Sequence, residues 1–163
     1  MSDVFHEHLV KRQKKSSEQV IKVVMIIFSV LLVAAGLVIH PLAMVPALAM
    51  LVADYFIFPR FDMEYEYQYV NGEIDIDAIY GRSRRKRLGT IGAEGIECIA
   101  PLGSHHLDRY NVGYKVVDYS SLDPQDKPYV IVKGAEKTKY YLNISEAMQN
   151  DLRYRMPRIF FRD

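Results

Sequence analysis

Two uncharged apolar runs, residues 23–39 and 42–58, dominate the hydropathy pattern of the chain and are separated by only two residues. At about 1.5 Å of rise per residue, a helix over either run covers roughly 26 Å, slightly less than a hydrocarbon core of about 30 Å. The first run can be extended toward the N-terminus, because the ammonium of Lys22 can reach the headgroups while its stem stays in the apolar layer. The pattern predicts a transmembrane helical hairpin over residues 19–58.

Basic residues flank this hairpin but are absent from its connection. Arg60 and a long charged segment follow it, and five basic residues lie before or at the start of the first run: Lys11, Arg12, Lys14, Lys15 and Lys22. By the positive-inside rule, both termini lie in the cytoplasm. The sequence therefore predicts a multi-pass cell-membrane protein with two helices, preceded by a basic cytoplasmic segment over residues 1–18.

Two alternatives to a spanning hairpin are open. A cleaved signal peptide would use the A-x-A-like site at residues 47–49, but its apolar segment would be far longer than the usual 7 to 15 residues. A re-entrant hairpin that stops short of the far leaflet fits the short runs and Pro46 in the second one.

Helical phase gathers the small and polar residues of each run on one stripe. Lys22, Ser29 and Gly36 share one face of the first helix, and Ala47 and Asp54 share one face of the second. Small residues permit close approach in lipid and a polar group facing hydrocarbon is costly, so we expect the stripes to face each other. We predict an intramembrane polar contact between Ser29 and Asp54; the alternative is that Asp54 leans out to the cytoplasmic interface.

Residues 59–163 predict one cytoplasmic domain made mostly of strands. Apolar and polar side chains alternate over residues 62–70 and 73–80, and Asn71-Gly72 between them is the preferred centre of a type I′ hairpin turn. Ser145 is a good N-cap for an amphipathic C-terminal helix. Five further strands are predicted at residues 88–91, 95–100, 115–120, 129–133 and 139–144. The fold class is α+β: the helical hairpin, then a seven-stranded antiparallel sheet or barrel with a C-terminal helix.

Composition narrows the partners of this domain. Residues 59–163 hold 16 Lys plus Arg and 16 Asp plus Glu, so no general electrostatic field favours nucleic acid, and we expect no nucleic-acid partner. The single cysteine, Cys98, cannot form an internal disulfide, which agrees with a reducing compartment. Its alternation with Ile96 and Ala100 predicts a buried strand position.

A basic cluster follows the hairpin turn and has two interpretations. It consists of Arg82, Arg84, Arg85, Lys86 and Arg87. It can form cross-strand ion pairs that relieve the repulsion between Glu66 and Asp77, which the two-residue turn places opposite each other. Alternatively, it can contact the membrane surface, where each basic residue near anionic headgroups contributes about 1 kcal/mol.

The order of elements resembles that of pleckstrin-homology-like (PH-like) domains, in which a C-terminal helix closes one end of a bent sheet or barrel. With the basic segment 9–15 and the tight hairpin, the stretches 64–67, 71–77 and 84–88 (EYEY, NGEIDID and RRKRL) make the chain similar to a family of small uncharacterised bacterial membrane proteins. The resemblance covers nearly the whole chain. It implies a membrane-tethered PH-like cytoplasmic domain and supplies no catalytic residues.

Candidate chemistry outside these features is sparse. His105, His106 and Asp108 lie in one loop, but adjacent histidines point to different sides and no distant ligand pattern completes a metal site. We therefore expect solvated loop residues here, and no catalytic residue, metal or cofactor. The C-terminal residues 153–162 mix Arg with Tyr, Ile and Phe, which suits either a membrane interface or a segment whose Ile159 and two phenylalanines fold back on the domain.

Three classes of function follow in order of preference. The first is a membrane-anchored, non-enzymatic binding or scaffolding module at the cytoplasmic face. The second is an accessory subunit of a larger membrane complex assembled through the hairpin, and the third is a membrane-bound enzyme using His105, His106 and Asp108. The expected partners are the lipid bilayer and either another protein or a second copy of the chain.

Overall fold

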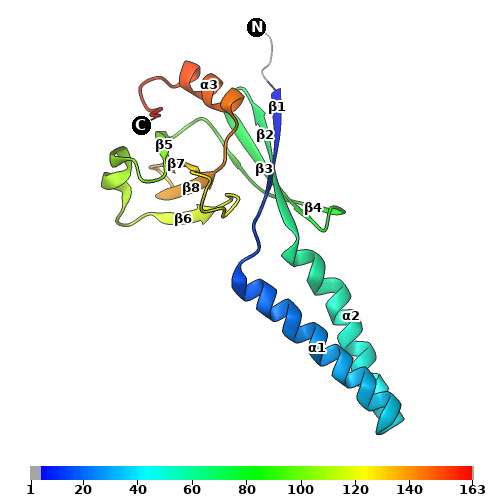
Figure 1. Cartoon of the computed structure of the whole chain (residues 1–163). Coiled ribbons are helices and arrows are strands. Elements are labelled where there is room, and N and C mark those ends of the chain that lie inside the picture. The colour runs from blue at the N-terminus through cyan, green and yellow to red at the C-terminus, as the bar shows by residue number, and fades with distance from the viewer. Residues whose placement is uncertain (1–4, 163) are drawn as a thin grey trace. The chain divides into compact units, whose positions relative to one another are not determined.

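The computed structural model describes residues 5–162 of the chain, so residues 1–4 of the predicted N-terminal segment and residue 163 of the predicted domain lie outside the described residues. The chain divides into two compact units (Figure 1). One is a helical unit made of residues 14–63 and 80–84. The other is a β domain, which in the described part of the chain is made of residues 5–13, 64–79 and 85–162.

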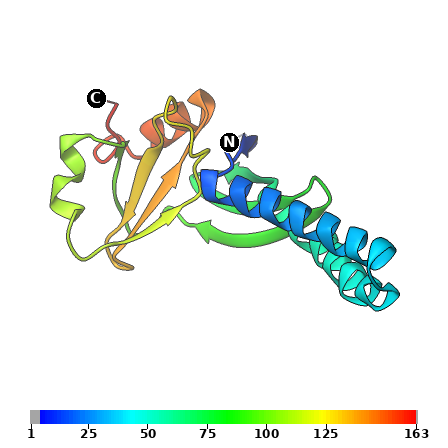
Figure 2. The same ribbon diagram turned by 60° about the horizontal axis from the view of Figure 1, so that its bottom comes forward.

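The helical unit is a hairpin of two long apolar helices. Helix α1 spans Ser16–Val38, the short 3₁₀ helix η1 spans Pro41–Ala43, and α2 spans Met44–Phe61. The backbone N–H of Lys15 donates to the Glu18 carboxylate at 3.1 Å, which caps the start of α1. Both helices are long and apolar enough to cross a membrane, and they run side by side (Figures 1 and 2).

The first sheet of the β domain has four strands in the order β1-β2-β3-β4. Their bounds are Phe5–Lys11, Met63–Val70, Glu73–Tyr80 and Arg84–Ile91. Strand β1 was not predicted, because the sequence indicated only a basic segment over this stretch. It pairs antiparallel with β2, with Phe5 opposite Val70 and Lys11 opposite Glu64, so the chain on either side of the helical hairpin joins one sheet.

The predicted β2–β3 hairpin is present, with its turn at Asn71 and Gly72. Both turn residues have positive φ, 51° and 98°, which a type I′ turn requires. The alternation also holds, because Tyr67, Tyr69 and Ile76 are fully or almost fully buried on one face of the sheet. Burial raises the pKa of the Tyr67 hydroxyl, which donates to the backbone carbonyl of Tyr119 at 2.5 Å.

The second sheet corrects the expected single seven-stranded antiparallel sheet or barrel. It has the order β5-β7-β8-β6, and β6 runs parallel to β8. Within residues 5–162, the domain therefore has eight strands in two four-stranded sheets. Alternation within a strand identifies the strand but does not specify its neighbour, which is why the sequence did not reveal this pairing. The strands span Ile96–Pro101 (β5), Lys115–Asp118 (β6), Tyr129–Lys133 (β7) and Thr138–Leu142 (β8).

The C-terminal helix α3, Glu146–Arg155, begins as predicted at Ser145, whose hydroxyl accepts from the backbone N–H of Met148. After the helix, the chain folds back on the domain. The backbone N–H of Phe161 donates to the carbonyl of Ile99 at 2.8 Å, and the N–H of Ile99 donates to the carbonyl of Ile159 at 2.7 Å. The apolar residues of this tail therefore extend the edge of the second sheet.

Candidate functional sites

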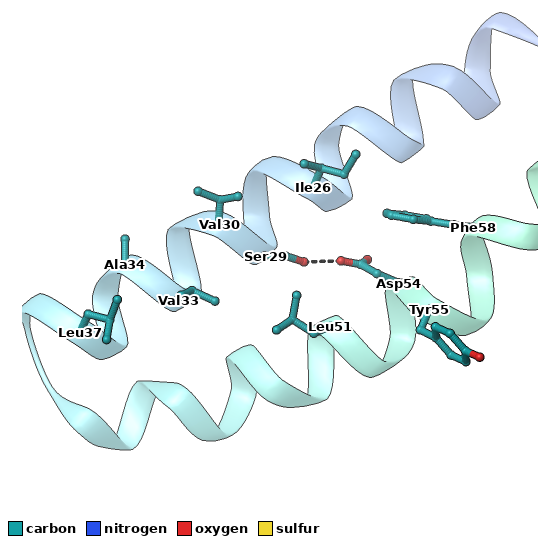
Figure 3. Close-up of a pocket in the computed structure, with 10 residues that line it drawn as sticks. All are labelled: Ile26, Ser29, Val30, Val33, Ala34, Leu37, Leu51, Asp54, Tyr55 and Phe58. Carbon is teal, nitrogen blue, oxygen red and sulfur yellow. Dashed lines mark hydrogen bonds between the residues drawn. The ribbon is translucent and has the colours of Figure 1, made fainter.

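The structure brings Ser29 and Asp54 together between the two helices of the hairpin. The Ser29 hydroxyl donates to Asp54 Oδ2 at 2.5 Å (Figure 3), and the two residues are only 3 % and 6 % exposed. Asp54 thus points into the hairpin rather than out to an interface. Helical phase had placed both side chains on the facing stripes.

Close helix approach depends on small residues along the same stripes. The buried positions of the two helices are Ser29 and Gly36 in α1 and Ala47 and Asp54 in α2. A Cβ atom built on Gly36 would lie 2.5 Å from the sulfur and 3.1 Å from the backbone nitrogen of Met44. A larger residue at position 36 would therefore push the Met44 side chain aside and press against the Met44 backbone.

A pocket of about 600 Å³ opens beside the polar pair (Figure 3). Its walls are almost entirely apolar and include Leu51 and Phe58 from α2 and Val30 and Val33 from α1. Asp54 Oδ1 is buried and has no hydrogen-bond partner among residues 5–162. The hairpin therefore carries one unsatisfied acceptor in an otherwise apolar pocket, which is a costly arrangement unless a donor reaches it.

Part of the basic cluster is used inside the first sheet. Arg85 on β4 forms ion pairs with Glu66 on β2 and with Asp77 on β3, the latter at 3.4 Å. Both carboxylates are nearly buried, with side chains 10 % and 13 % exposed. Arg85 thus neutralises the two acids that the β2–β3 turn places opposite each other.

A second polar group on the same sheet joins Arg87, Asp75 and Thr90. Arg87 pairs with the Asp75 carboxylate, and the Thr90 hydroxyl donates to the same carboxylate at 2.5 Å. The hydrogen bond from Thr90, with Arg87 beside it, holds the pKa of Asp75 below its ordinary value despite partial desolvation. This cluster is a structural feature of the sheet.

The other three basic residues of the cluster are exposed to solvent. Arg82, Arg84 and Lys86 are exposed, and none of them forms an ion pair with a carboxylate in the described part of the chain. Arg84 and Lys86 alternate with Arg85 and Arg87 along β4, so they project from the opposite face of the strand.

The histidine loop folds into a 3₁₀ helix, η2, over His105–Tyr110. His106 stacks on Phe161, with ring centroids 3.6 Å apart, while His105 and Asp108 are exposed. Within residues 5–162, no group of three metal-ligating side chains comes together. The loop therefore offers a packing contact to the C-terminal tail rather than a metal centre.

Residues 2–162 match the sequence model of a family described as Bacterial PH-like domain (DUF6106). The chain belongs to this family. Comparison with curated proteins and with solved structures found no match. The expected resemblance to a bacterial PH-like family is thereby confirmed, and PH-like domains are typically non-enzymatic binding modules.

One buried polar residue of this PH-like protein was not among the predicted site residues. Lys139 on β8 is only 7 % exposed and lines a second, smaller pocket beside η2. The sequence contained a signal for this position, because side chains alternate along a strand. Lys139 and Tyr141 therefore share one face of β8, and Leu142 is on the other face. The alternation of apolar residues along the strand predicts the strand but does not show that this lysine is buried.

Proposed function

We propose that this protein is a membrane-anchored, non-enzymatic binding or scaffolding module at the cytoplasmic face of a bacterial membrane. One observation carries the anchoring part: the hairpin buries only its polar and small stripe and turns large apolar side chains outward. Ile39, Val45 and Leu48 are 80 %, 68 % and 65 % exposed. A continuous apolar surface of this kind is unfavourable in water and suits a bilayer.

The binding part rests on the family and on the separate core of the β domain. One buried cluster of this core contains Cys98, Val130 and Val132, which are at most 1 % exposed. A domain with its own core can present loops and strands to a partner without help from the hairpin.

The exposed cations of β4 and the turn before it support contact with anionic headgroups. Arg82, Arg84 and Lys86 are the three members of the basic cluster without an ion pair among the described residues. Each such residue near an anionic leaflet contributes about 1 kcal/mol. We assign the lipid contact of the cluster to these three residues and the sheet-stabilising contact to Arg85 and Arg87.

Extraction at high pH tests the anchoring. Membranes containing the full-length chain are washed with carbonate, and we expect the chain to stay in the pellet. A variant with Ile27→Lys, Leu31→Lys and Leu48→Lys puts charges on the outward face of the hairpin and should be lost from the pellet. The matched control places lysine at Val70, Val112 and Tyr154, which are exposed in the β domain, and should stay. Release of the wild-type chain by carbonate would overturn the proposal.

A second candidate, an accessory subunit assembled through the hairpin, is favoured by the unsatisfied Asp54 Oδ1. A partner helix that donates a hydrogen bond into this pocket would satisfy that oxygen and cover the apolar walls. Size-exclusion chromatography with light scattering in mild detergent tests it on material extracted from native membranes. We expect a protein mass above the 18.8 kDa of one chain, reduced to 18.8 kDa in Asp54→Leu and kept in Tyr55→Phe. A wild-type mass of 18.8 kDa would exclude this candidate.

A further inference from the structure

The β domain contains a cavity of about 200 Å³ between η2 and the β7–β8 part of the second sheet. Leu107 and Val130 form apolar walls, while Asp108, Asn111 and Lys139 contribute polar side chains. Such a mixture of an apolar wall and a few polar groups is typical of ligand sites, although this cavity is smaller than those that take drug-sized molecules.

The position of Lys139 gives the cavity its chemistry. In the centre of the sheet, Lys139 lies opposite Val132 on β7 and Val116 on β6, so its stem is flanked by apolar neighbours. It is 7 % exposed, and in the described part of the chain it has neither an ion pair nor a side-chain hydrogen bond. Lys133, by contrast, has Glu136 at 2.8 Å.

The stem of Lys139 is buried, but its ammonium is not among the buried side-chain atoms without a partner in residues 5–162, so it keeps access to the cavity, where an anion can reach it. Among the described residues, Asp108 is the only acid that lines the cavity, and it forms no ion pair with Lys139. Asp108 and Asn111 add a carboxylate acceptor and an amide to the same lining. The cavity thus offers a cation for a carboxylate and separate polar groups for a hydrogen-bond donor.

We propose that this cavity binds a small organic acid that also carries a hydrogen-bond donor, an amino or hydroxy acid. Lys139 holds the carboxylate, Asp108 and Asn111 receive the donor, and Leu107 and Val130 contact the carbon chain. The cavity volume restricts the ligand to a small molecule. This inference rests on the proposed binding function of the domain and is independent of the membrane anchor.

Thermal unfolding of the full-length chain in detergent micelles tests the site. L-alanine and L-lactate are the probes, inorganic phosphate is the competing anion, and sodium chloride keeps the ionic strength equal. A ligand that binds only the folded state raises Tm, and we expect at least one organic acid to raise it by about 4 °C or more at saturation. No rise with either acid, or an equal rise with phosphate, would overturn the proposal.

Lys139→Met keeps the stem and removes the charge, while Lys127→Met does the same at an exposed lysine. We expect Lys139→Met to lose the response to both acids, because the cation that holds the carboxylate is gone. Lys127→Met should keep the response. A Lys139→Met chain that still responds would overturn the assignment.

Asp108→Asn provides a second test on an exposed side chain, in case Lys139→Met fails to fold. We expect this change to weaken the response to alanine, whose ammonium prefers a carboxylate, more than the response to lactate. Equal responses to alanine in Asp108→Asn and the wild type would remove Asp108 from the site. Loss of ligand response with intact membrane retention refutes the cavity alone, whereas carbonate release with intact ligand response refutes the anchor alone.

Discussion

At the scale of single residues, Asp54 is the buried polar group of the hairpin whose hydrogen bonds are incomplete. It accepts one hydrogen bond from Ser29 and has a second oxygen without a partner among the described residues. The Ser29 hydroxyl therefore bears directly on the stability of the helix pair, because its loss would leave both carboxylate oxygens unsatisfied.

We predict that Ser29→Ala destabilises the hairpin by about 1 kcal/mol, the usual size of a hydrogen bond between helices in lipid. Unfolding of the full-length chain in mixed micelles by added SDS measures this change. Ser17→Ala, at an exposed position of α1, is the control and should shift stability by less than about 0.5 kcal/mol. Equal effects of the two substitutions would show that the Ser29 contact contributes nothing.

A second prediction concerns the acid sensitivity of the first sheet. The hydrogen bond from Thr90, with Arg87 nearby, lowers the folded-state pKa of Asp75 below the ordinary value of 3.8. A depressed carboxylate pKa stabilises the fold above the unfolded-state pKa, and this contribution disappears as the pH falls through the folded-state pKa.

Thr90→Val should therefore lower the free energy of unfolding by about 0.5–1 kcal/mol at neutral pH, and the difference from the wild type should vanish in strong acid. Denaturant titrations at a series of pH values measure it. Thr90→Ser keeps the hydroxyl and should follow the wild-type profile. A difference that is the same at every pH would show that the Asp75–Thr90 contact is not its source.

At the scale of elements, β1 joins the chain before the hairpin to the sheet after it. Its inward-facing residues are His6, His8 and Val10, and His6 and His8 lie over Tyr69 and Tyr67 with ring centroids 6.3 Å and 6.1 Å apart. The strand is therefore part of the fold rather than a free basic tail.

Truncating the inward face of β1 should matter more than truncating its outward face. Val10 is 6 % exposed and its neighbour Leu9 is 58 % exposed. We expect Val10→Ala to reduce the free energy of unfolding by about 1–2 kcal/mol and Leu9→Ala by less than about 0.5 kcal/mol. Thermal or denaturant unfolding of the full-length chain provides both values. A larger loss for Leu9→Ala would contradict the β1–β2 register.

The elements differ in how much local sequence determines them. The Asn71-Gly72 turn and the Ser145 N-cap act through their own backbone and side chains, so the sequence alone located both. Strand β1 was missed because its inward face carries histidines, and the apolar residues Phe5 and Leu9 face outward. Its partner lies more than fifty residues away along the chain, and only the fold shows which face is covered.

At the scale of the whole molecule, the sequence also indicated the polar contact of the hairpin, because helix geometry fixes which residues share a face. The sequence could not show which basic residues of the cluster form ion pairs, because this depends on how the strands pair. Arg85 and Arg87 contact acids on neighbouring strands, and the alternation of β4 turns Arg84 and Lys86 away from those acids. The Lys139 cavity was equally hidden, since it forms where residues 102–111 cover the second sheet.

We propose that the hairpin crosses the membrane and leaves the β domain in the cytoplasm. Single-cysteine labelling tests this claim in a Cys98→Ser background, with a cysteine introduced either at His40 in the helical connection or at Lys127 in the β domain. Intact cells are treated with a membrane-impermeant maleimide before and after permeabilisation. We expect His40→Cys to be labelled in intact cells and Lys127→Cys to be labelled only after permeabilisation. Protection of both cysteines in intact cells, or labelling of Lys127→Cys from outside, would contradict it.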